Sequence, residues 1–246
     1  MTVLGENDAA CRARIGIVVP SVNTVMEPWA QRTAPPGVDV HFSRMFIPDL
    51  LSRETLIEMD RTEGMDGIRQ VASARPNVIA YGCTASSIVQ GVAYDQHLRE
   101  DIETRFKVAA TTAAHAILQA ADALGVRKVS LVSPYTSAVA EAEHAYFESA
   151  GLKVLGGAHL GIADGFQLAA PTPDELFQLG RKGWSGASDA LIISCLNTHS
   201  HAAIAALEEA LGKPVITSTQ ATLWHALRLA TVRDPIAGYG QLLSRH

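Results

Sequence analysis

The chain has 246 residues, of which 48% are hydrophobic and 18% are charged, and its formal net charge is −5. This composition is typical of a folded globular protein and excludes a disordered chain. The slightly acidic balance offers no basic surface, which argues against a nucleic-acid partner. The N-terminal stretch MTVLGENDAACRAR lacks the apolar run that a signal peptide or a membrane span requires. We therefore predict a cytoplasmic protein that binds neither membrane nor nucleic acid.

The cysteines and histidines exclude two further kinds of site. Cys11, Cys83 and Cys195 form no CxxC pair, so the sequence indicates neither a disulfide framework nor a zinc site. The nine histidines show no HExxH spacing, and no GxGxxG or GxxxxGKS/T motif is present. We expect reduced thiols, no metal and no organic cofactor.

Short runs rich in Val and Ile alternate along the chain with longer amphipathic stretches. Such runs are typical of strands buried on both faces of a parallel sheet. The predicted strands are 14–19, 38–42, 77–82, 107–111, 128–133, 152–156, 190–194 and 214–217. The predicted helices are 50–73, 87–105, 112–124, 136–150, 173–184, 200–211 and 219–230. This alternation predicts an α/β protein with parallel sheets built from right-handed βαβ units.

Two pairs of segments repeat at a nearly constant offset. The pairs are IGIVVPSVNT (15–24) with VSLVSPYTS (129–137), and NVIAYGCTASS (77–87) with ALIISCLNTHS (190–200). Pro20 and Pro134 lie 114 residues apart, and the two cysteines of the second pair lie 112 residues apart. We infer two similar α/β halves in which Cys83 and Cys195 are equivalent.

The position of these two cysteines predicts a shared site. Ligands of open parallel sheets bind beyond the carboxyl ends of the strands, where Cys83 and Cys195 stand. The segments TASS and NTHS that follow them indicate helix starts, whose exposed N–H groups bind carboxylates and lower the pKa of a nearby thiol. A single buried cysteine is often an inert apolar residue. Equivalent cysteines in both halves favour a catalytic pair.

Polar residues beside the cysteines and in the repeated loops are candidate substrate ligands. Asn23 either caps the helix that VMEPW begins, binds the substrate, or does both. Tyr135 occupies the equivalent loop of the second half, where its hydroxyl either binds a carboxylate or packs in the loop. Thr84 and Ser86 either bind an anion or only begin a helix. The full candidate set is Asn23, Thr24, Thr84, Ser86, Tyr135, Leu196 and Asn197.

Two opposed thiols support two kinds of chemistry. One thiol can remove a proton from a carbon next to a carboxylate while the other delivers a proton from the opposite face. Alternatively, one thiolate can add to an activated double bond while the other thiol transfers a proton. Neither reaction needs a metal or an organic cofactor.

VVPSVNTVMEP, YGCTASS, LVSPYTS, IISCLNT and GKPVITSTQATLWHALR resemble the aspartate/glutamate racemase superfamily. Within it, they are most similar to the branch of maleate cis–trans isomerases and arylmalonate decarboxylases. The resemblance covers residues 13–240 and implies two facing, pseudo-symmetric Rossmann-like halves with parallel four-stranded sheets. It also implies an active site in the cleft between them and a homo-oligomer. We divide the chain into a first half, 1–112 plus 217–246, and a second half, 113–216.

The resemblance also implies roles for individual residues. In maleate isomerases the cysteine matching Cys83 adds to the alkene, and the one matching Cys195 handles the proton at the neighbouring carbon. Asn23 and Tyr135 match residues that hold carboxylates. However, these isomerases tend to have an asparagine where this chain has Gly165, and arylmalonate decarboxylases have a glycine in place of Cys83.

We therefore expect a cofactor-independent isomerase of a small carboxylate, with maleate to fumarate as the leading reaction. Three alternatives remain open. The first is racemisation next to a carboxylate by the two thiols, as for an amino acid or hydantoin. The second is decarboxylation of a substituted malonate by Cys195 alone, and the third is a non-catalytic protein that binds small acids.

Overall fold

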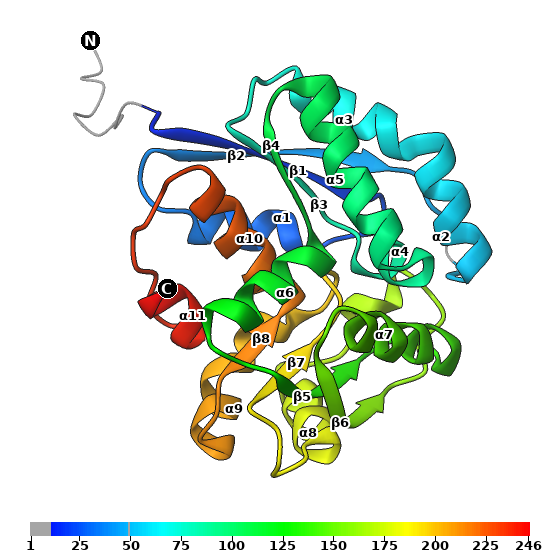
Figure 1. Cartoon of the computed structure of the whole chain (residues 1–246), viewed down its shortest axis with the longest axis vertical. Helices are drawn as coiled ribbons and strands as arrows, with labels where there is room; N and C mark the ends of the chain where they lie inside the picture. Colours follow the sequence, from blue (N-terminus) through cyan, green and yellow to red (C-terminus); the bar gives the residue numbers. More distant parts are fainter. Residues whose placement is uncertain (1–10, 49) are drawn as a thin grey trace.

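The computed structural model describes residues 11–48 and 50–246. These residues form two four-stranded sheets in which all paired strands are parallel, with helices packed around them (Figure 1). The first sheet has the order β2-β1-β3-β4 and the second has the order β6-β5-β7-β8. The second order repeats the first four strands later, so the predicted α/β fold with two parallel four-stranded sheets is confirmed.

The strands lie close to the predicted ranges. They are β1 (Ala13–Pro20), β2 (Val38–Met45), β3 (Val78–Tyr81), β4 (Ala109–Thr112), β5 (Lys128–Ser133), β6 (Lys153–His159), β7 (Ala190–Ile193) and β8 (Val215–Thr217). Strands β1, β3, β5 and β7 occupy the two central positions of each sheet. Strands β3 and β7 are buried along their whole length, which accounts for their continuous apolar sequence.

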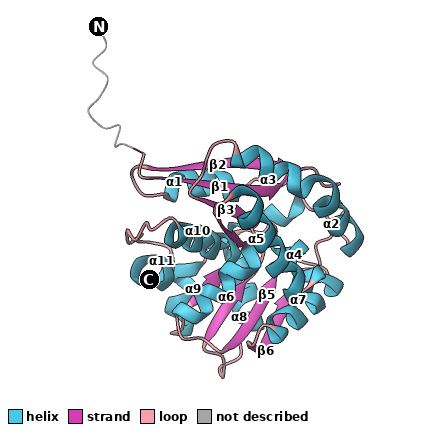
Figure 2. Ribbon diagram, turned by 45° about the horizontal axis from the view of Figure 1, so that its top comes forward, coloured by secondary structure: helices cyan, strands magenta, loops and turns pink. Residues whose placement is uncertain are grey.

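The helices cover the faces of both sheets (Figure 2). They are α1 (Met26–Thr33), α2 (Arg53–Met59), α3 (Met65–Ala72), α4 (Thr84–Gln90), α5 (Val92–Phe106), α6 (Ala113–Ala123), α7 (Ser137–Ser149), α8 (Pro173–Gly183), α9 (Ile204–Leu211), α10 (Ser218–Leu229) and α11 (Gly240–Arg245). Three further segments are the π-helical η1 (Asp60–Gly64) and the 3₁₀ turns η2 (Gln167–Ala169) and η3 (His199–Ala202).

Several helices differ from the prediction. The stretch 50–73 is divided into α2, η1 and α3, and the stretch 87–105 is divided into α4 and α5. The second break occurs at Gly91, whose φ of 92° ends α4 at low cost because glycine has no side chain to clash. The sequence indicated the start of α1 but not its full length, and it did not indicate α11 at all. Both helices are too short to produce a clear helical period.

Helices α6 and α10 join the two sheets. In Figure 1 the first sheet lies in the upper part of the view, the second in the lower part, and these two helices lie between them. Helix α10 follows β8 of the second sheet but also contacts β3 and β4 of the first. One hydrophobic cluster includes Ile17 from the first sheet, Ile192 from the second and Leu223 from α10. Helix α10 also packs against α6 of the second half, so the assignment of 217–246 to the first half stays a prediction.

Two loops meet above the junction between the halves. The loop after β2 and the loop after β6 pair through an isolated bridge between Leu50 and Asp164. The backbone N–H of Leu51 also donates to the carbonyl of Ala163 at 2.8 Å. Across the part of the chain that the structure describes, every helix is too short or too polar to cross a membrane.

Candidate active site

A pocket lies where the carboxyl ends of the four central strands meet. It contains about 380 Å³ of space free of atoms and is lined by both halves. Seven of the predicted site residues line it: Asn23, Cys83, Thr84, Tyr135, Cys195, Leu196 and Asn197. Its apolar lining consists largely of Pro20, Val22, Ile47, Leu51, Leu56 and Leu168. Thr24 and Ser86 lie outside this lining; Thr24 is exposed, whereas Ser86 is fully buried.

Cys83 follows the end of β3 and directly precedes α4. Its side chain is 5% exposed. The preceding Gly82 lets the backbone pass close to β1, because a Cβ there would lie 2.7 Å from the carbonyl oxygen of Val18. Burial raises the pKa of the Cys83 thiol to about 12, and the nearby charge of Asp60 adds to this rise. Hydrogen bonds from Ser86 oppose the rise but do not cancel it.

Cys195 follows β7 and has a strained backbone. Its φ of 94° lies in a region that side chains other than glycine rarely adopt, and such strain is concentrated at functional sites. Two hydrogen bonds hold this backbone: its N–H donates to Ser218 Oγ at 2.9 Å, and its carbonyl accepts from Thr198 Oγ1 at 3.1 Å. The Sγ atom faces the backbone N–H of Asn197 at an N–S distance of 3.3 Å.

Burial also raises the pKa of the Cys195 thiol to about 12. Hydrogen bonds from Tyr135 and from the backbone of Asn197 lower it, and the charge of Glu143 raises it. The expected lowering of both thiol pKa values is therefore wrong. The loss of hydration at these buried thiols outweighs the favourable contacts that the sequence indicated. In addition, residues 196–197 form a turn, and the 3₁₀ turn η3 begins only at His199.

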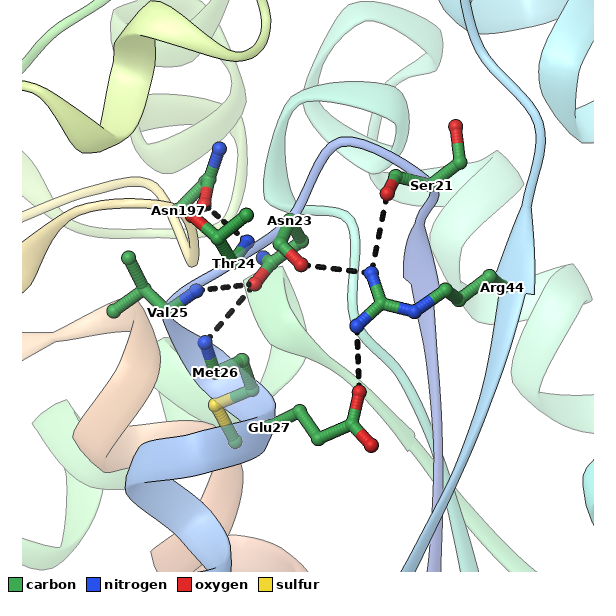
Figure 3. Close-up of polar contacts among 8 residues, drawn as sticks. All are labelled: Ser21, Asn23, Thr24, Val25, Met26, Glu27, Arg44 and Asn197. Carbon is green, nitrogen blue, oxygen red and sulfur yellow. Dashed lines mark hydrogen bonds and ion pairs between the residues drawn. The ribbon is translucent and has the colours of Figure 1, made fainter.

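Asn23 caps α1 and also lines the pocket. Its Oδ1 accepts hydrogen bonds from the backbone N–H groups of Val25 at 3.1 Å and Met26 at 2.9 Å (Figure 3). Asn23 can therefore cap the helix and bind the substrate at the same time, because the cap uses Oδ1 and leaves the amide Nδ2 free to donate elsewhere. Its role as a substrate ligand remains a prediction.

Arg44 fixes the loop that carries Asn23. Its guanidinium donates to the carbonyls of Ser21 at 3.1 Å and Asn23 at 2.8 Å and forms an ion pair with Glu27 at 2.5 Å (Figure 3). No motif in the sequence singles out Arg44. The strand pairing would have pointed to it, because Arg44 lies next to Val19 at the carboxyl end of β1.

Asn197 uses its side-chain amide to join loops of both halves. Its Oδ1 accepts from the backbone N–H of Thr24 at 2.9 Å (Figure 3), and its Nδ2 donates to the carbonyls of Gly165 at 3.0 Å and Val22 at 3.3 Å. Both amide hydrogens thus have protein acceptors. In this arrangement Asn197 shapes the pocket by holding its walls, and direct substrate contact remains a prediction.

Ser218 is a further residue that the sequence analysis missed. Its Oγ accepts from the backbone N–H of Cys195 and from Thr84 Oγ1 at 3.1 Å, so it links the segments that carry the two cysteines. The sequence contains no signal for this role, because Ser218 is the first residue of α10 and approaches Thr84 only through the packing of the two halves.

A sequence profile of the arylmalonate decarboxylase family matches residues 15–243. The chain belongs to this family. A maleate isomerase from Geobacillus stearothermophilus is 26% identical over 247 residues, which cover 94% of this chain and 97% of that relative. The resemblance to the branch of maleate isomerases and arylmalonate decarboxylases is thereby confirmed.

Solved structures of maleate isomerases have the same fold as this member of the arylmalonate decarboxylase family. A mutant maleate isomerase Iso from Pseudomonas putida with maleate has a TM-score of 0.89 and 27% identity, covering 94% of this chain and 97% of that chain. A Nocardia farcinica maleate cis–trans isomerase mutant has a TM-score of 0.88 and 25% identity, covering 95% and 99%. The latter contains a covalently bound succinylcysteine intermediate.

The pocket of this family member is dominated by thiols, hydroxyls and apolar groups. None of its described lining residues is Lys, Arg, His, Asp or Glu. Among residues 11–48 and 50–246, no cluster of three or more His, Cys, Asp or Glu side chains could hold a metal ion. Hydrogen bonds from hydroxyl and amide groups are strengthened in such a dry site, which suits proton transfer and thiol addition.

Proposed function

We propose that this protein is a cofactor-independent, cysteine-dependent isomerase of a small carboxylate, with maleate to fumarate as the leading reaction. The observation that supports this most is the presence of Cys83 and Cys195 in one pocket, at equivalent strand ends of the two halves. The covalent cysteine intermediate of the Nocardia farcinica relative supports addition of a thiol to the substrate.

The proposed reaction begins with the thiolate of Cys83. It adds to one alkene carbon, and the electron pair of the double bond moves to the neighbouring carbon, where the adjacent carboxylate stabilises it. The thiol of Cys195 protonates that carbon. The new carbon–carbon single bond rotates, the Cys195 thiolate removes a proton, and elimination of the Cys83 thiolate releases the trans product.

Three polar groups are proposed to hold the substrate carboxylates. They are the amide of Asn23, the hydroxyl of Tyr135 and Thr84, all of which line the pocket. The low local polarity makes each hydrogen bond to a carboxylate stronger than it is in water. Ser86 lies outside the lining, and its hydroxyl donates to the backbone carbonyl of Cys83 at 3.4 Å instead.

Racemisation next to a carboxylate is the second candidate. The site has Gly165 where the resemblance leads us to expect an asparagine, and apolar side chains surround that position. A Cβ on Gly165 would lie 3.2 Å from Val22 Cγ2 and 3.3 Å from Leu51 Cδ2. A pocket with one apolar end favours a substrate with one carboxylate and an apolar group, on which the two thiols would act as base and acid.

Proton NMR in D2O separates these reactions. The purified protein is incubated with maleate, beside the Cys83→Ser and Cys195→Ser variants and, as a matched control, Cys11→Ser, which changes an exposed cysteine. We expect fumarate from the wild type and the Cys11→Ser variant, and none from the other two.

Unchanged maleate with the wild type would contradict the maleate proposal. The same three variants would then be tested with racemisable acids and with a substituted malonate. Exchange of the α-hydrogen for deuterium, lost in both pocket variants, would identify a racemase. Release of CO2 that survives in Cys83→Ser but not in Cys195→Ser would identify a decarboxylase.

A further inference from the structure

Ser218 carries a fully buried hydroxyl that the mechanism above does not use. It is the first residue of α10 and lies outside the lining of the pocket. Its Oγ accepts hydrogen bonds from the backbone N–H of Cys195 at 2.9 Å and from Thr84 Oγ1 at 3.1 Å. Both partners line the pocket, one from each half. The hydroxyl of Ser218 therefore lies directly behind the pocket wall.

The start of α10 does not need this hydroxyl. Thr217 caps the helix, since its Oγ1 accepts from the backbone N–H of Gln220 at 3.1 Å. In return, Gln220 Oε1 accepts from the backbone N–H of Thr217 at 3.3 Å. This capping box satisfies the helix start in the usual way. The contacts of Ser218 with Cys195 and Thr84 therefore serve the junction of the two halves and not the helix.

Thr84 is the residue through which Ser218 can act on a substrate. It lines the pocket, and it is proposed above to hold a substrate carboxylate. A hydroxyl group has one hydrogen to donate and two lone pairs that accept. In the structure Thr84 donates its hydrogen to Ser218. To hold a carboxylate, Thr84 must turn this hydrogen towards the carboxylate oxygen, and Ser218 can then donate its own hydrogen to Thr84 Oγ1.

We propose that Ser218 is a positioning residue that supports Thr84 in binding a substrate carboxylate. The backbone N–H of Cys195 donates to Ser218 Oγ, Ser218 donates to Thr84 Oγ1, and Thr84 donates to the carboxylate. Only the two hydroxyl hydrogens rotate, so no covalent bond breaks and no proton is transferred. This inference rests on the proposed function in one respect, namely that Thr84 holds a carboxylate.

The lack of positive charge in the pocket gives such a chain its importance. The lining residues that the structure describes include no Lys, Arg or His, so neutral donors must hold the carboxylate. Hydrogen bonds in a chain polarise one another, and each is stronger in an apolar site than in water. The first donor is also fixed in place, because the carbonyl of Cys195 accepts from Thr198 Oγ1 at 3.1 Å. Thr84 thus becomes a stronger and better oriented donor than an isolated hydroxyl.

Ser130 provides a matched control. It is fully buried in β5, and its Oγ accepts from the backbone N–H of Ser185 at 2.8 Å. It also shares a hydrogen bond with Ser188 Oγ at 3.0 Å. These contacts are of the same kind as those of Ser218, but all three serines lie outside the pocket lining. Ser130→Ala therefore removes equivalent buried hydrogen bonds without touching the site.

The test compares two alkylating reagents that differ in charge. Iodoacetate carries a carboxylate, whereas iodoacetamide carries a neutral amide in its place. The rates at Cys83 are measured by peptide mass spectrometry in a Cys11→Ser background, and their ratio cancels changes in thiol reactivity and access. Ser218→Ala should lower the ratio of the iodoacetate rate to the iodoacetamide rate at least about threefold. Ser130→Ala should leave this ratio unchanged.

A double-mutant cycle shows whether Ser218 acts through Thr84. Thr84→Val keeps the shape of the side chain but removes the hydroxyl, so it should lower the same ratio. In the Thr84→Val background, Ser218→Ala should have no further effect, because the chain is already broken. A further fall in that background would overturn the proposal. An unchanged ratio in Ser218→Ala or in Thr84→Val, or an equal fall in Ser130→Ala, would also overturn it.

A second variant guards against misfolding of Ser218→Ala. Ser218→Cys keeps an acceptor for the backbone N–H of Cys195, but its S–H group is only a weak donor to Thr84. The ratio should therefore fall in this variant too, and an unchanged ratio would contradict the proposal. The measurement needs no substrate. A failure of maleate turnover in the wild type would contradict the proposed function, while the alkylation ratio still decides this inference.

Discussion

Cys83 and Cys195 follow equivalent strands of two sheets with the same order, and both are almost completely buried. Their surroundings differ. Cys83 has an ordinary extended backbone, with φ −130° and ψ 97°, and directly precedes a helix. Cys195 has φ 94° and directly precedes a turn. The charge of Asp60 raises the pKa of Cys83, whereas the charge of Glu143 raises that of Cys195, whose sulfur accepts from the backbone N–H of Asn197 at 3.3 Å.

This difference shows how two structurally equivalent cysteines can have different chemical roles. The same strand end places both thiols in the pocket, and burial raises both pKa values to about 12. The neighbours then distinguish them: the charge of Asp60 and hydrogen bonds from Ser86 act on the pKa of Cys83, whereas Tyr135 and the backbone N–H of Asn197 act on that of Cys195. We expect Cys83 to attack the substrate and Cys195 to exchange protons with it.

The largest expected contrast between the two cysteines is covalent trapping. With maleate, Cys195→Ser should accumulate an adduct on Cys83, because addition can occur while the later proton steps are slowed. Cys83→Ser should form no adduct on Cys195. Both variants should lose turnover by about 1,000-fold or more. Intact-protein mass spectrometry measures the adduct, and an adduct on Cys195 would reverse the proposed roles.

Glu143 provides the next largest contrast, because its carboxyl near Cys195 is fully buried. Burial raises its pKa to about 7, and its Oε1 atom has no hydrogen-bond partner among the residues that the structure describes. Between its ordinary pKa and about 7, the unfolded chain ionises Glu143 while the folded protein keeps it protonated. Stability should therefore fall as pH rises through this window, by roughly 3 kcal/mol.

Urea unfolding at several pH values measures this effect. The Glu143→Gln variant should lose this part of the pH dependence and gain stability relative to the wild type above neutral pH. His115, His201 and His225, whose pKa values are lowered to about 4, act in the opposite direction in both proteins. The difference between variant and wild type therefore isolates Glu143. No difference in slope would contradict its raised pKa.

A smaller contrast concerns the backbone at the two cysteines. A glycine at position 195 would adopt the φ of 94° with little strain. At position 83 the backbone is extended and unstrained, so a glycine there would relieve no strain. Cys195→Gly should therefore cost about 1–2 kcal/mol less free energy of unfolding than Cys83→Gly. Both variants lose a buried thiol, so each controls for the other. Equal losses in chemical denaturation would show that the backbone of Cys195 is not strained.

The smallest expected effect is on the alkylation rates of the two thiols, when the hydroxyl group near each one is removed. A hydrogen bond from Ser86 lowers the pKa of Cys83, and one from Tyr135 lowers the pKa of Cys195. Ser86→Ala should slow alkylation of Cys83, and Tyr135→Phe should slow alkylation of Cys195, each by about threefold to tenfold. Peptide mass spectrometry reports both cysteines in one sample. Slowing at the wrong cysteine would contradict this assignment.

Several features of the site could be predicted from the sequence because they depend on local pattern. The Val- and Ile-rich runs identified the eight strands that residues 11–48 and 50–246 form, and the repeated motifs identified Cys83 and Cys195 as equivalent. The strand ends of parallel sheets gather on one edge, so the shared pocket followed from that rule. The break at Gly91 was missed because an isolated glycine inside a helical pattern is not a firm stop signal, and η1 has no sequence signal that distinguishes it from an α-helix.

The tertiary structure decided the chemical state of these residues. Helix-start motifs suggested low thiol pKa values, yet burial by residues distant in sequence raised both. Asn197 appeared as a ligand beside Cys195, but folding brings its amide to Thr24, Gly165 and Val22. The charges of Asp60 and Glu143 raise the thiol pKa values only because η1 and α7 pack near the cysteines in the folded chain. Local sequence determined where the thiols stand, whereas their hydration and neighbouring charges depend on distances that only the folded chain defines.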